Sequence, residues 1–427
     1  MDRQSLLNEG LLAKFLRYVQ VDTASAEEAG KVPSTPGQLD LARMLRDELL
    51  VLGLRDAALD DHGFVTATLP GNLGRPAPTI GLLAHLDTFP GVPGANVKPL
   101  VHRNYQGGEI RLPSGETLTP AEFPALLQAI GHDLVTSDGT TLLGADDKSG
   151  IAAIMETLCR LLREPELKHG PVKVAFTPDE EVGGGIDLFD VARFGADVAY
   201  TLDGSGIGEL EAENFYARNY TVTITGVSAH TGSARGKMIN AIHLAAEFVS
   251  AFPATARPET TDGREGFYHP DEISGNVERV AIKVLARDFT REGIERKDRT
   301  LRELGALLAL RYPGAAVEVK QTNSYDNMRE VLDRNRKVVK LAEEAIRRAG
   351  VEPVRRSIRG GTDGARLSFK GLPTPNLSNG SENVHSRREW ASVQWMEKAA
   401  EIACQLVLLW AEEPGPPTQR CSCSEHQ

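Results

Sequence analysis

Two histidines and three carboxylates stand at places in this sequence where a predicted strand or loop ends. They are His85, Asp146, Glu181, Asp203 and His385. Neutral imidazole and carboxylate are the ligand types of zinc, cobalt and manganese sites in hydrolases. Five ligands exceed the four that one tetrahedral zinc ion needs, whereas two metal ions that share a bridging carboxylate would use all five. The types and number of these residues therefore indicate a two-metal hydrolytic site.

His85 and Asp87 lie two positions apart at the end of a strand predicted over 79–84. In an extended chain residues i and i+2 point to the same face, so the carboxylate of Asp87 can orient the imidazole of His85. Taken alone, the pair is explained better as a strand-end histidine beside a capping aspartate. The late His385, in Asn-Val-His-Ser, is likewise by itself typical of a satisfied polar residue.

Three further clusters are rich in acids. Asp146 and Asp147 begin a helix predicted over 147–163, three acids at 179–181 follow a strand predicted over 172–177, and Asp203 closes a strand predicted over 197–202. Like charges packed at a strand end are costly unless cations or protons relieve them. The alternatives are a solvated helix start for Asp146 and Asp147 and an acidic surface turn for residues 179–181.

Two glycine-rich runs look like nucleotide-binding loops but lack the necessary residues. A phosphate-binding loop needs glycine directly before its Lys-Ser pair, and here Asp147 precedes Lys148 and would repel phosphate. The run at 204–208 has Glu209 where a dinucleotide fingerprint needs its third glycine, and no helix-forming run follows. We therefore reject both nucleotide interpretations.

The elements that position these residues alternate between buried strands and helices, which predicts an α/β fold with a largely parallel sheet. Such sheets place ligands at the carboxyl ends of their strands. The pattern changes near residue 213, because residues 220–225 alternate strictly between apolar side chains and threonine. The order β-α-β-β-α-β that follows is that of a ferredoxin-like α+β module. We expect a catalytic domain over 1–212 and 326–412, an inserted domain over 213–325, and a flexible tail over 413–427.

Composition excludes other classes of protein. The chain of 427 residues carries 48 Lys and Arg against 59 Asp and Glu, a formal net charge of −11, which argues against a nucleic-acid partner. No apolar run approaches the ~20 residues that span a bilayer, and the first residues do not form a signal peptide. Four cysteines in this length are no disulfide framework. We expect a cytoplasmic protein that does not bind membranes, and the alternating strand of the inserted domain can pair with a second copy to give a homodimer.

Taken together and in order, the clusters resemble the co-catalytic zinc peptidases of the M20 family. The matching runs are His85-Leu86-Asp87, 137–148, 176–183, Asp203-Gly204, 359–364 and His385. Within the family the sequence is most similar to tripeptide aminopeptidases, from the first helix to about residue 410. The fold that the resemblance implies is a zinc-exopeptidase-like α/β domain with an inserted ferredoxin-like lid domain.

The resemblance also implies roles for the candidate residues. Asp146 bridges the two metal ions, His85 and Asp203 complete one site, and Glu181 and His385 complete the other. Asp87 braces His85, and Glu180 is the general base. Asp147 follows the bridging residue and takes an unusual backbone geometry in relatives.

The inserted domain is expected to contribute to the same reaction. His230, in the run Gly-Val-Ser-Ala-His-Thr-Gly, corresponds to a residue that stabilises the tetrahedral oxyanion, whereas the alternative is a surface histidine at a strand end. Arg287 and Arg359 are candidates to bind the carboxylate of the substrate, for which a bidentate guanidinium is suited. Either arginine could instead form a structural ion pair.

The expected function is hydrolysis of the N-terminal peptide bond of short peptides, chiefly tripeptides, by a water molecule that bridges the metals. The cofactors would be two divalent metal ions. Zinc is the expected metal, with cobalt or manganese as alternatives. A dipeptidase, a carboxypeptidase or an amide deacylase could use the same scaffold. A non-catalytic metal-binding protein is the remaining alternative, and Glu180 argues against it, because a pure binding site needs no base beside its metals.

Overall fold

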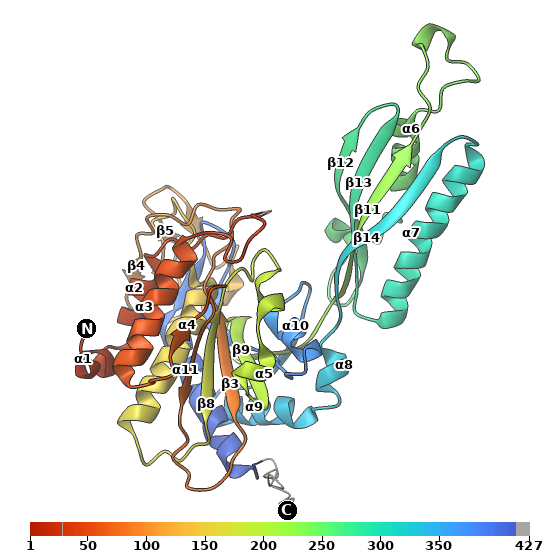
Figure 1. The fold of residues 1–427 in the computed structure, drawn as a ribbon. Coiled ribbons are helices and arrows are strands. Elements are labelled where there is room, and N and C mark those ends of the chain that lie inside the picture. Colours follow the sequence, from red (N-terminus) through yellow and green to blue (C-terminus); the bar gives the residue numbers. More distant parts are fainter. Residues whose placement is uncertain (28, 416–427) are drawn as a thin grey trace, which may run out of the picture. The chain divides into compact units, whose positions relative to one another are not determined.

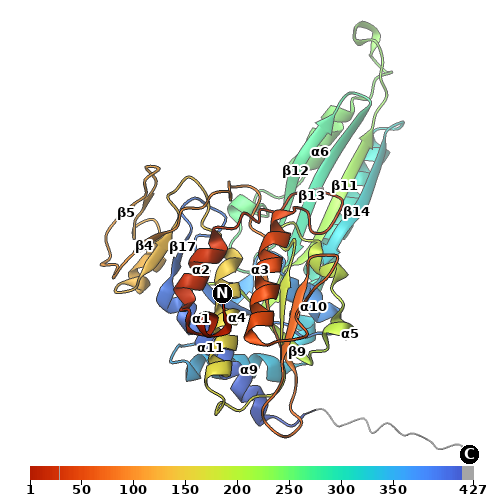
Figure 2. The ribbon, with the colours of Figure 1, turned by 60° about the vertical axis from the view of Figure 1, so that its left-hand side comes forward.

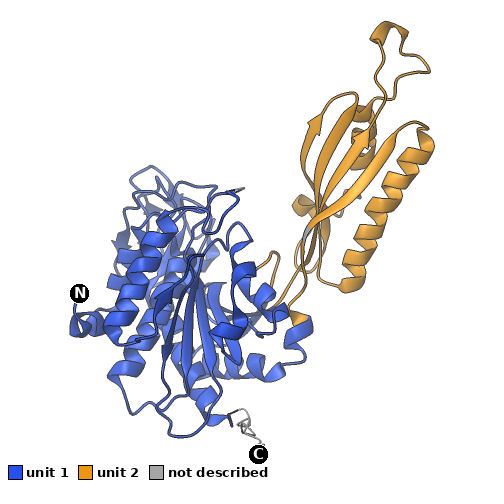
Figure 3. Ribbon diagram, viewed as in Figure 1, with its two compact units in different colours: residues 1–212, 330–356, 362–427 blue, residues 213–329, 357–361 orange. Residues whose placement is uncertain are grey.

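The computed structural model describes residues 1–27 and 29–415, and the chain divides into two compact units (Figure 3). Unit 1 consists of residues 1–212, 330–356 and 362–427, and unit 2 of residues 213–329 and 357–361. Unit 2 thus includes Ser357–Gly361, which we expected in the catalytic domain, and extends to Arg329 rather than 325. Of the predicted tail, residues 416–427 lie outside the described part of the chain.

The core of unit 1 is an eleven-stranded sheet (Figure 1). Its main path runs β1 (Ala58–Leu59), β2 (Val65–Leu69), β8 (Val172–Thr177), β3 (Ile80–His85), β9 (Val198–Ser205), β16 (Asn376–Glu382), β17 (Trp390–Ser392), β7 (Leu134–Thr136) and β4 (Leu100–His102). Off this path, β10 (Glu209–Asn214) pairs with β16 and with β15 (Val354–Ile358).

Only the centre of this sheet is parallel, which corrects the expectation of a largely parallel sheet. Strands β8, β3, β9 and β16 run parallel to their neighbours in this group, whereas β1, β2, β17, β7 and β4 pair antiparallel. For two of these pairs the reason is connection length: only residues 60–64 join β1 to β2 and only 383–389 join β16 to β17. Such short loops close antiparallel pairs, since a parallel pair needs a crossover of a dozen residues or more.

Helices cover both faces of the sheet (Figures 1 and 2). The helices of unit 1 and its boundary are α1 (Arg3–Asn8), α2 (Leu11–Val19), α3 (Gly37–Leu52), α4 (Ala145–Arg163), α5 (Val191–Phe194), α8 (Arg329–Leu332), α9 (Arg336–Arg348), α10 (Asp363–Phe369) and α11 (Val393–Glu412), with 3-10 turns η1 (Pro124–Ala129) and η2 (Gly185–Leu188). On one face, Tyr200 of β9 is hydrogen bonded to Val338 of α9 and Trp410 of α11. On the other, Ala199 packs with Phe194 and Leu367, from α5 and α10. None of the helices in the described part of the chain is long and apolar enough to cross a membrane.

Residues 98–143 form a small layer that continues this sheet through β4 and β7, and the sequence did not predict it. It contains β4, β7, the hairpin β5 (Ile110–Arg111) and β6 (Thr117–Leu118), and η1. Leu118, Leu126 and Leu134 pack there against Trp390 and Trp395. This layer joins the segment after β3 to the segment before α4, so it connects two parts of the chain that carry candidate ligands.

Unit 2 has four antiparallel strands in the order β12-β13-β11-β14, with two helices on one face (Figure 1). Its elements are β11 (Tyr216–Thr225), η3 (Thr231–Ser233), α6 (Ala241–Ser250), η4 (Pro258–Thr260), β12 (Phe267–Gly275), β13 (Arg279–Asp288), α7 (Arg291–Arg311) and β14 (Ala316–Tyr325). Val222 and Ile224 are buried against Phe248 of α6 and Leu301 of α7. The chain order β-α-β-β-α-β and the insertion of unit 2 into unit 1 confirm the predicted fold class.

Candidate metal centre

The five candidate ligands all lie in unit 1, at the ends of its central elements. His85 is the last residue of β3, Asp203 lies near the end of β9, and Glu181 lies in the turn after β8. These three strands are parallel neighbours, so their carboxyl ends meet at one edge of the sheet. Asp146 comes from the first turn of α4, and His385 from the loop between β16 and β17.

The structure brings these five side chains together around Asp146. The Nε2 atom of His85 lies 2.9 Å from Asp146 Oδ1 and 3.3 Å from Asp203 Oδ1. The Nε2 atom of His385 lies 3.1 Å from Asp146 Oδ2 and 2.9 Å from Glu181 Oε2. The two oxygens of one carboxylate therefore face two different histidines, each of which has a second acid beside it.

This donor set fits two divalent cations. Glu181 Oε1 is buried and has no hydrogen-bond partner among the described residues, as expected of an atom arranged to bind an ion. Ligand atoms of His85, Asp146 and Glu181 lie within 4.8 Å of one another, and so do those of His85, Asp147 and Asp203. Imidazole nitrogen and carboxylate oxygen are the ligands that zinc, cobalt and manganese accept.

The pKa shifts in the cluster indicate that its carboxylates are not balanced by enough positive charge. Burial raises the pKa of Asp203 to about 8. Burial, reinforced by the charge of Asp203, raises the pKa of Glu180 well above its usual value. Burial lowers the pKa of His385, but hydrogen bonds with Asp146 and Glu181 outweigh it and raise that pKa to about 10. Acids that hold protons and histidines that gain them are what neighbouring carboxylates produce without a cation, so an ion would relieve both effects.

Asp87 holds the turn at residues 180–181 as well as His85, the one partner that the sequence indicated. The Nδ1 atom of His85 lies 2.9 Å from the carbonyl oxygen of Asp87 and 3.4 Å from its Oδ1, which places the ring proton on Nδ1 and leaves Nε2 for a metal. The carboxylate of Asp87 also accepts the backbone N–H groups of Glu180 (3.0 Å) and Glu181 (3.1 Å). One buried residue thus fixes a candidate ligand on β3 through its carbonyl oxygen and the acidic turn after β8 through its carboxylate.

Asp179 and Asp147 resemble their neighbours in sequence but are held differently. Asp179 has a positive φ of 58°, and its carboxylate accepts hydrogen bonds from the Ser34 N–H and the Gln38 amide, both at 2.7 Å. It anchors the turn rather than facing the cluster. Asp147 is buried, accepts a hydrogen bond of 2.9 Å from the Asn379 amide, and follows a cis peptide bond after Asp146.

Glu389 is a residue of this centre that the sequence analysis missed. It is 1% exposed, and its Oε2 accepts the N–H groups of Leu143 and Gly144 at 2.8 Å each. Its Oε1 accepts the N–H of Asp146 at 3.0 Å. Glu389 therefore holds the segment that presents Asp146. Its place four residues after His385 is the only signal in the sequence, and a single glutamate in a loop is not specific.

The three candidates of unit 2 have local contacts within that unit. His230 is the N-cap residue of η3, and its Nδ1 accepts the N–H of Gly232 at 3.2 Å. Arg287, on β13, donates from Nη1 to Asn219 Oδ1 at 2.9 Å and to the carbonyl oxygen of Ala286 at 3.0 Å.

Arg359 is engaged by the main chain around η4. Its Nη1 donates to the carbonyl oxygens of Gly263 at 2.7 Å and Glu265 at 3.1 Å, and its Nη2 donates to Thr261 Oγ1 at 3.1 Å. These bonds are structural, but they are not the ion pair that the sequence analysis named as the alternative.

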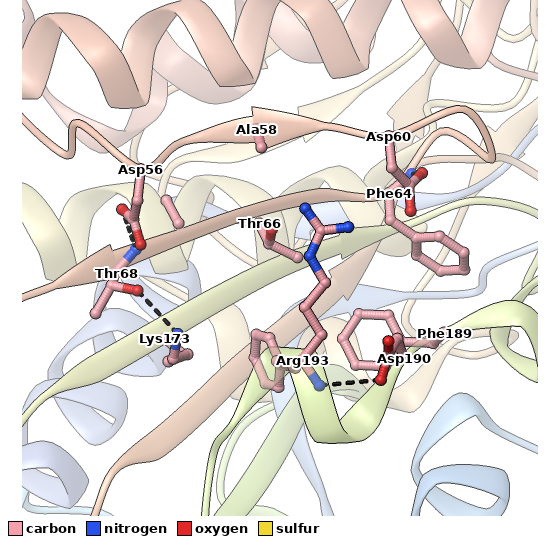
Figure 4. A pocket seen from close by; sticks show the side chains of 12 residues that line it. Asp56, Ala58, Asp60, Phe64, Thr66, Thr68, Lys173, Phe189, Asp190 and Arg193 are labelled. Carbon is pink, nitrogen blue, oxygen red and sulfur yellow. Dashed lines mark hydrogen bonds between the residues drawn. The ribbon is translucent and has the colours of Figure 1, made fainter.

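A pocket of about 250 Å³ lies near the β1 edge of the sheet and shares no residue with the cluster (Figure 4). Its charged side chains serve local structure: Asp56 accepts the N–H of Thr68 at 2.9 Å, and Lys173 donates to the hydroxyl of Thr68 at 3.1 Å. Asp190 caps α5 through the N–H of Arg193. The pocket therefore does not supply the chemistry expected from the sequence.

Known proteins similar to this chain include peptidases. The family model of Peptidase family M20/M25/M40 matches residues 136–409. Peptidase T of Geobacillus thermodenitrificans is 48% identical over 409 residues, which cover 95% of this chain and 100% of that relative. The crystal structure of aminopeptidase PepT from Bacillus cereus has a TM-score of 0.74 at 26% identity and covers 94% of this chain and 98% of its own. The YXEP protein of Bacillus subtilis, a dinuclear metal binding peptidase from the M20 family, shares the fold with a TM-score of 0.62 at 16% identity over 96% of this chain and 99% of its own.

Proposed function

Because this chain belongs to peptidase family M20/M25/M40, we propose that it is a metal-dependent aminopeptidase that removes the N-terminal residue of tripeptides. The observation that carries the proposal is the position of Asp146, whose two oxygens face His85 and His385. Relatives over nearly the whole chain are named Peptidase T, and a structural neighbour is an aminopeptidase. The arrangement suits two metal ions that share one carboxylate.

Two ligand sets are proposed around that shared carboxylate. His85 and Asp203 would hold one ion with Asp146, and Glu181 and His385 would hold the other. When bound, the ions supply polarisation of the scissile carbonyl and acidification of the attacking water. Zinc is the metal that this donor set favours, with cobalt and manganese as alternatives.

Glu180 is proposed as the general base. Its backbone N–H is fixed by Asp87, and its neighbour Glu181 is a ligand, so its carboxylate belongs to the turn that borders the cluster. A carboxylate takes the proton from the attacking water and returns it to the amine that leaves. Burial raises the pKa of the Glu180 carboxyl toward neutral pH, where a carboxyl group can both accept a proton and give it up.

The residues of unit 2 are proposed to act on the substrate. His230 would donate a hydrogen bond from Nε2 to the oxyanion, since its imidazole is exposed and its hydrogen bond within the described chain is at Nδ1. Arg287 would bind the carboxylate end of a short peptide: its guanidinium lies over the Tyr325 ring, and the hydrogen bonds it makes to described residues come from Nη1. For Arg359 the bonds to 261–265 favour a role in holding that loop beside Arg287. The cytoplasmic location and the homodimer stay predictions.

Hydrolysis of four substrates separates the alternatives. With purified protein, Ala-Ala-Ala should be converted to Ala and Ala-Ala, and Ala-Ala and N-acetyl-alanine should be poor substrates. Chelation should abolish turnover and zinc should restore it. Faster cleavage of Ala-Ala would indicate a dipeptidase, and release of alanine from its N-acetyl derivative would indicate a deacylase. Release of the C-terminal residue from a C-terminally labelled tripeptide would indicate a carboxypeptidase.

A further inference from the structure

The two candidate histidine ligands are held in different ways. His85 is 2% exposed at its side chain and is fixed at Nδ1 by Asp87. The side chain of His385 is 40% exposed, and its backbone is in the left-handed region at φ 59°. Among the described residues, no partner is found that donates to or accepts from its Nδ1. His385 therefore lacks the hydrogen bond that usually orients a histidine ligand.

A stacked aromatic ring takes the place of that hydrogen bond. The ring of Phe89 lies parallel to the imidazole of His385, with 4.3 Å between centroids and 3° between planes. Phe89 is four residues beyond His85, so the loop that leaves one ligand reaches the other across 296 positions of sequence. Gly91 leaves room for this ring, because a Cβ atom there would lie 2.4 Å from Cε1 of Phe89.

From this contact we infer that Phe89 is a positioning residue that sets the affinity of the Glu181–His385 site for its metal ion. The inference rests on the proposed two-metal function. A ligand already held in place loses less side-chain freedom when the ion binds, so removal of the ring should weaken that site selectively. The two ligands of the other site, His85 and Asp203, contact Asp87 and Asp146 instead and should be unaffected.

Zinc titration of the metal-free full chain tests this inference. Four proteins are compared: wild type, Phe89→Leu, Phe89→Tyr, and Phe252→Leu, which removes a buried ring from the core of unit 2. In Phe89→Leu one ion should bind as in wild type and the other about tenfold more weakly, which corresponds to about 1.4 kcal/mol. Phe89→Tyr keeps the ring and should restore the affinity of the weakened site, and Phe252→Leu should bind both ions normally.

Several results would overturn the inference. Equal affinity of both ions in Phe89→Leu and wild type would show that the stack has no effect on the site. Equal weakening of both ions, or a similar loss in Phe252→Leu, would show general destabilisation. Thermal unfolding of the metal-free proteins checks that each variant is folded, and if Phe89→Leu is not, the titration of Phe89→Met decides in its place. If wild type itself binds fewer than two ions, the proposed function fails rather than the role of Phe89.

Discussion

Glu389→Gln changes the support of Asp146 without changing a candidate ligand. The wild-type carboxylate accepts three backbone N–H groups, those of Leu143, Gly144 and Asp146. A glutamine side chain has one acceptor oxygen and one donor NH₂. If its oxygen takes the place of Oε2, the N–H groups of Leu143 and Gly144 keep a neutral acceptor, and the N–H of Asp146 faces another donor.

The cost follows from these contacts. A buried donor that loses its partner costs about 1–3 kcal/mol, and each of the two remaining bonds loses about 1 kcal/mol when its acceptor is no longer charged. The free energy of unfolding should therefore fall by up to about 4 kcal/mol, and removal of a buried charge offsets part of this loss. Burial raises the pKa of Glu389 to about 7, so the comparison belongs at pH 8, where the wild-type carboxylate is charged.

Urea unfolding and zinc titration measure the two consequences. Because Asp146 lies beside both histidines, Glu389→Gln should weaken both metal sites, unlike the change at Phe89. Glu382→Gln is the matched control, since Glu382 ends the neighbouring strand β16 and accepts no hydrogen bond from residues 143–146 within the described chain. An unfolding free energy within 1 kcal/mol of wild type, together with unchanged zinc affinity, would refute the role given to Glu389.

Glu180→Gln should leave two ions bound and lower kcat for a tripeptide by about 10²–10⁴-fold, because only proton transfer is removed. Metal analysis and steady-state kinetics check this, and full activity would exclude Glu180 as the base. His230→Gln should lower kcat by about 10²–10³-fold at unchanged metal content, as expected for the loss of an oxyanion donor. A change confined to KM would contradict that role. Burial raises the pKa of Glu211 from 4.5 to about 7, although the Asn376 amide donates to its carboxylate at 2.7 Å. The folded chain then keeps a proton that the unfolded chain releases, so this group contributes stability below pH 4.5 that is lost as the pH rises to 7. Glu211→Gln should remove that part of the pH dependence in urea unfolding at pH 5 and pH 7.5, and an unchanged slope between these pH values would show that Glu211 titrates normally.

The parts of the fold that the sequence predicts are those with a strong local pattern. The buried strands β3 and β8 consist mostly of apolar residues, as expected of strands covered on both faces. Residues 220–225 of β11 alternate strictly between apolar residues and threonine, as expected of a strand with one buried face. The strands of residues 98–143 contain two or three residues each, too few to show a period. Their burial depends on distant side chains such as Trp390, which local sequence does not reveal.

The candidate site divides in a similar way. His85, Glu181 and Asp203 could be predicted because they lie at or just after the ends of buried strands. A polar or charged side chain there is unusual unless it binds a ligand or takes part in catalysis. Residues that act through others carry no such mark: Phe89 is an ordinary aromatic residue in sequence, and Glu389 is one of many acids. Asp179 could not be told from the next two acids, since only the folded turn shows that Ser34 and Gln38 occupy its carboxylate.

The central claim is that two ions share the carboxylate of Asp146. Anomalous X-ray diffraction from crystals of the zinc-loaded wild-type protein tests it most directly. The geometry predicts two peaks, one beside His85 and Asp203 and one beside Glu181 and His385, separated by ~3.5–4 Å. A single peak, or peaks remote from Asp146, would contradict the account.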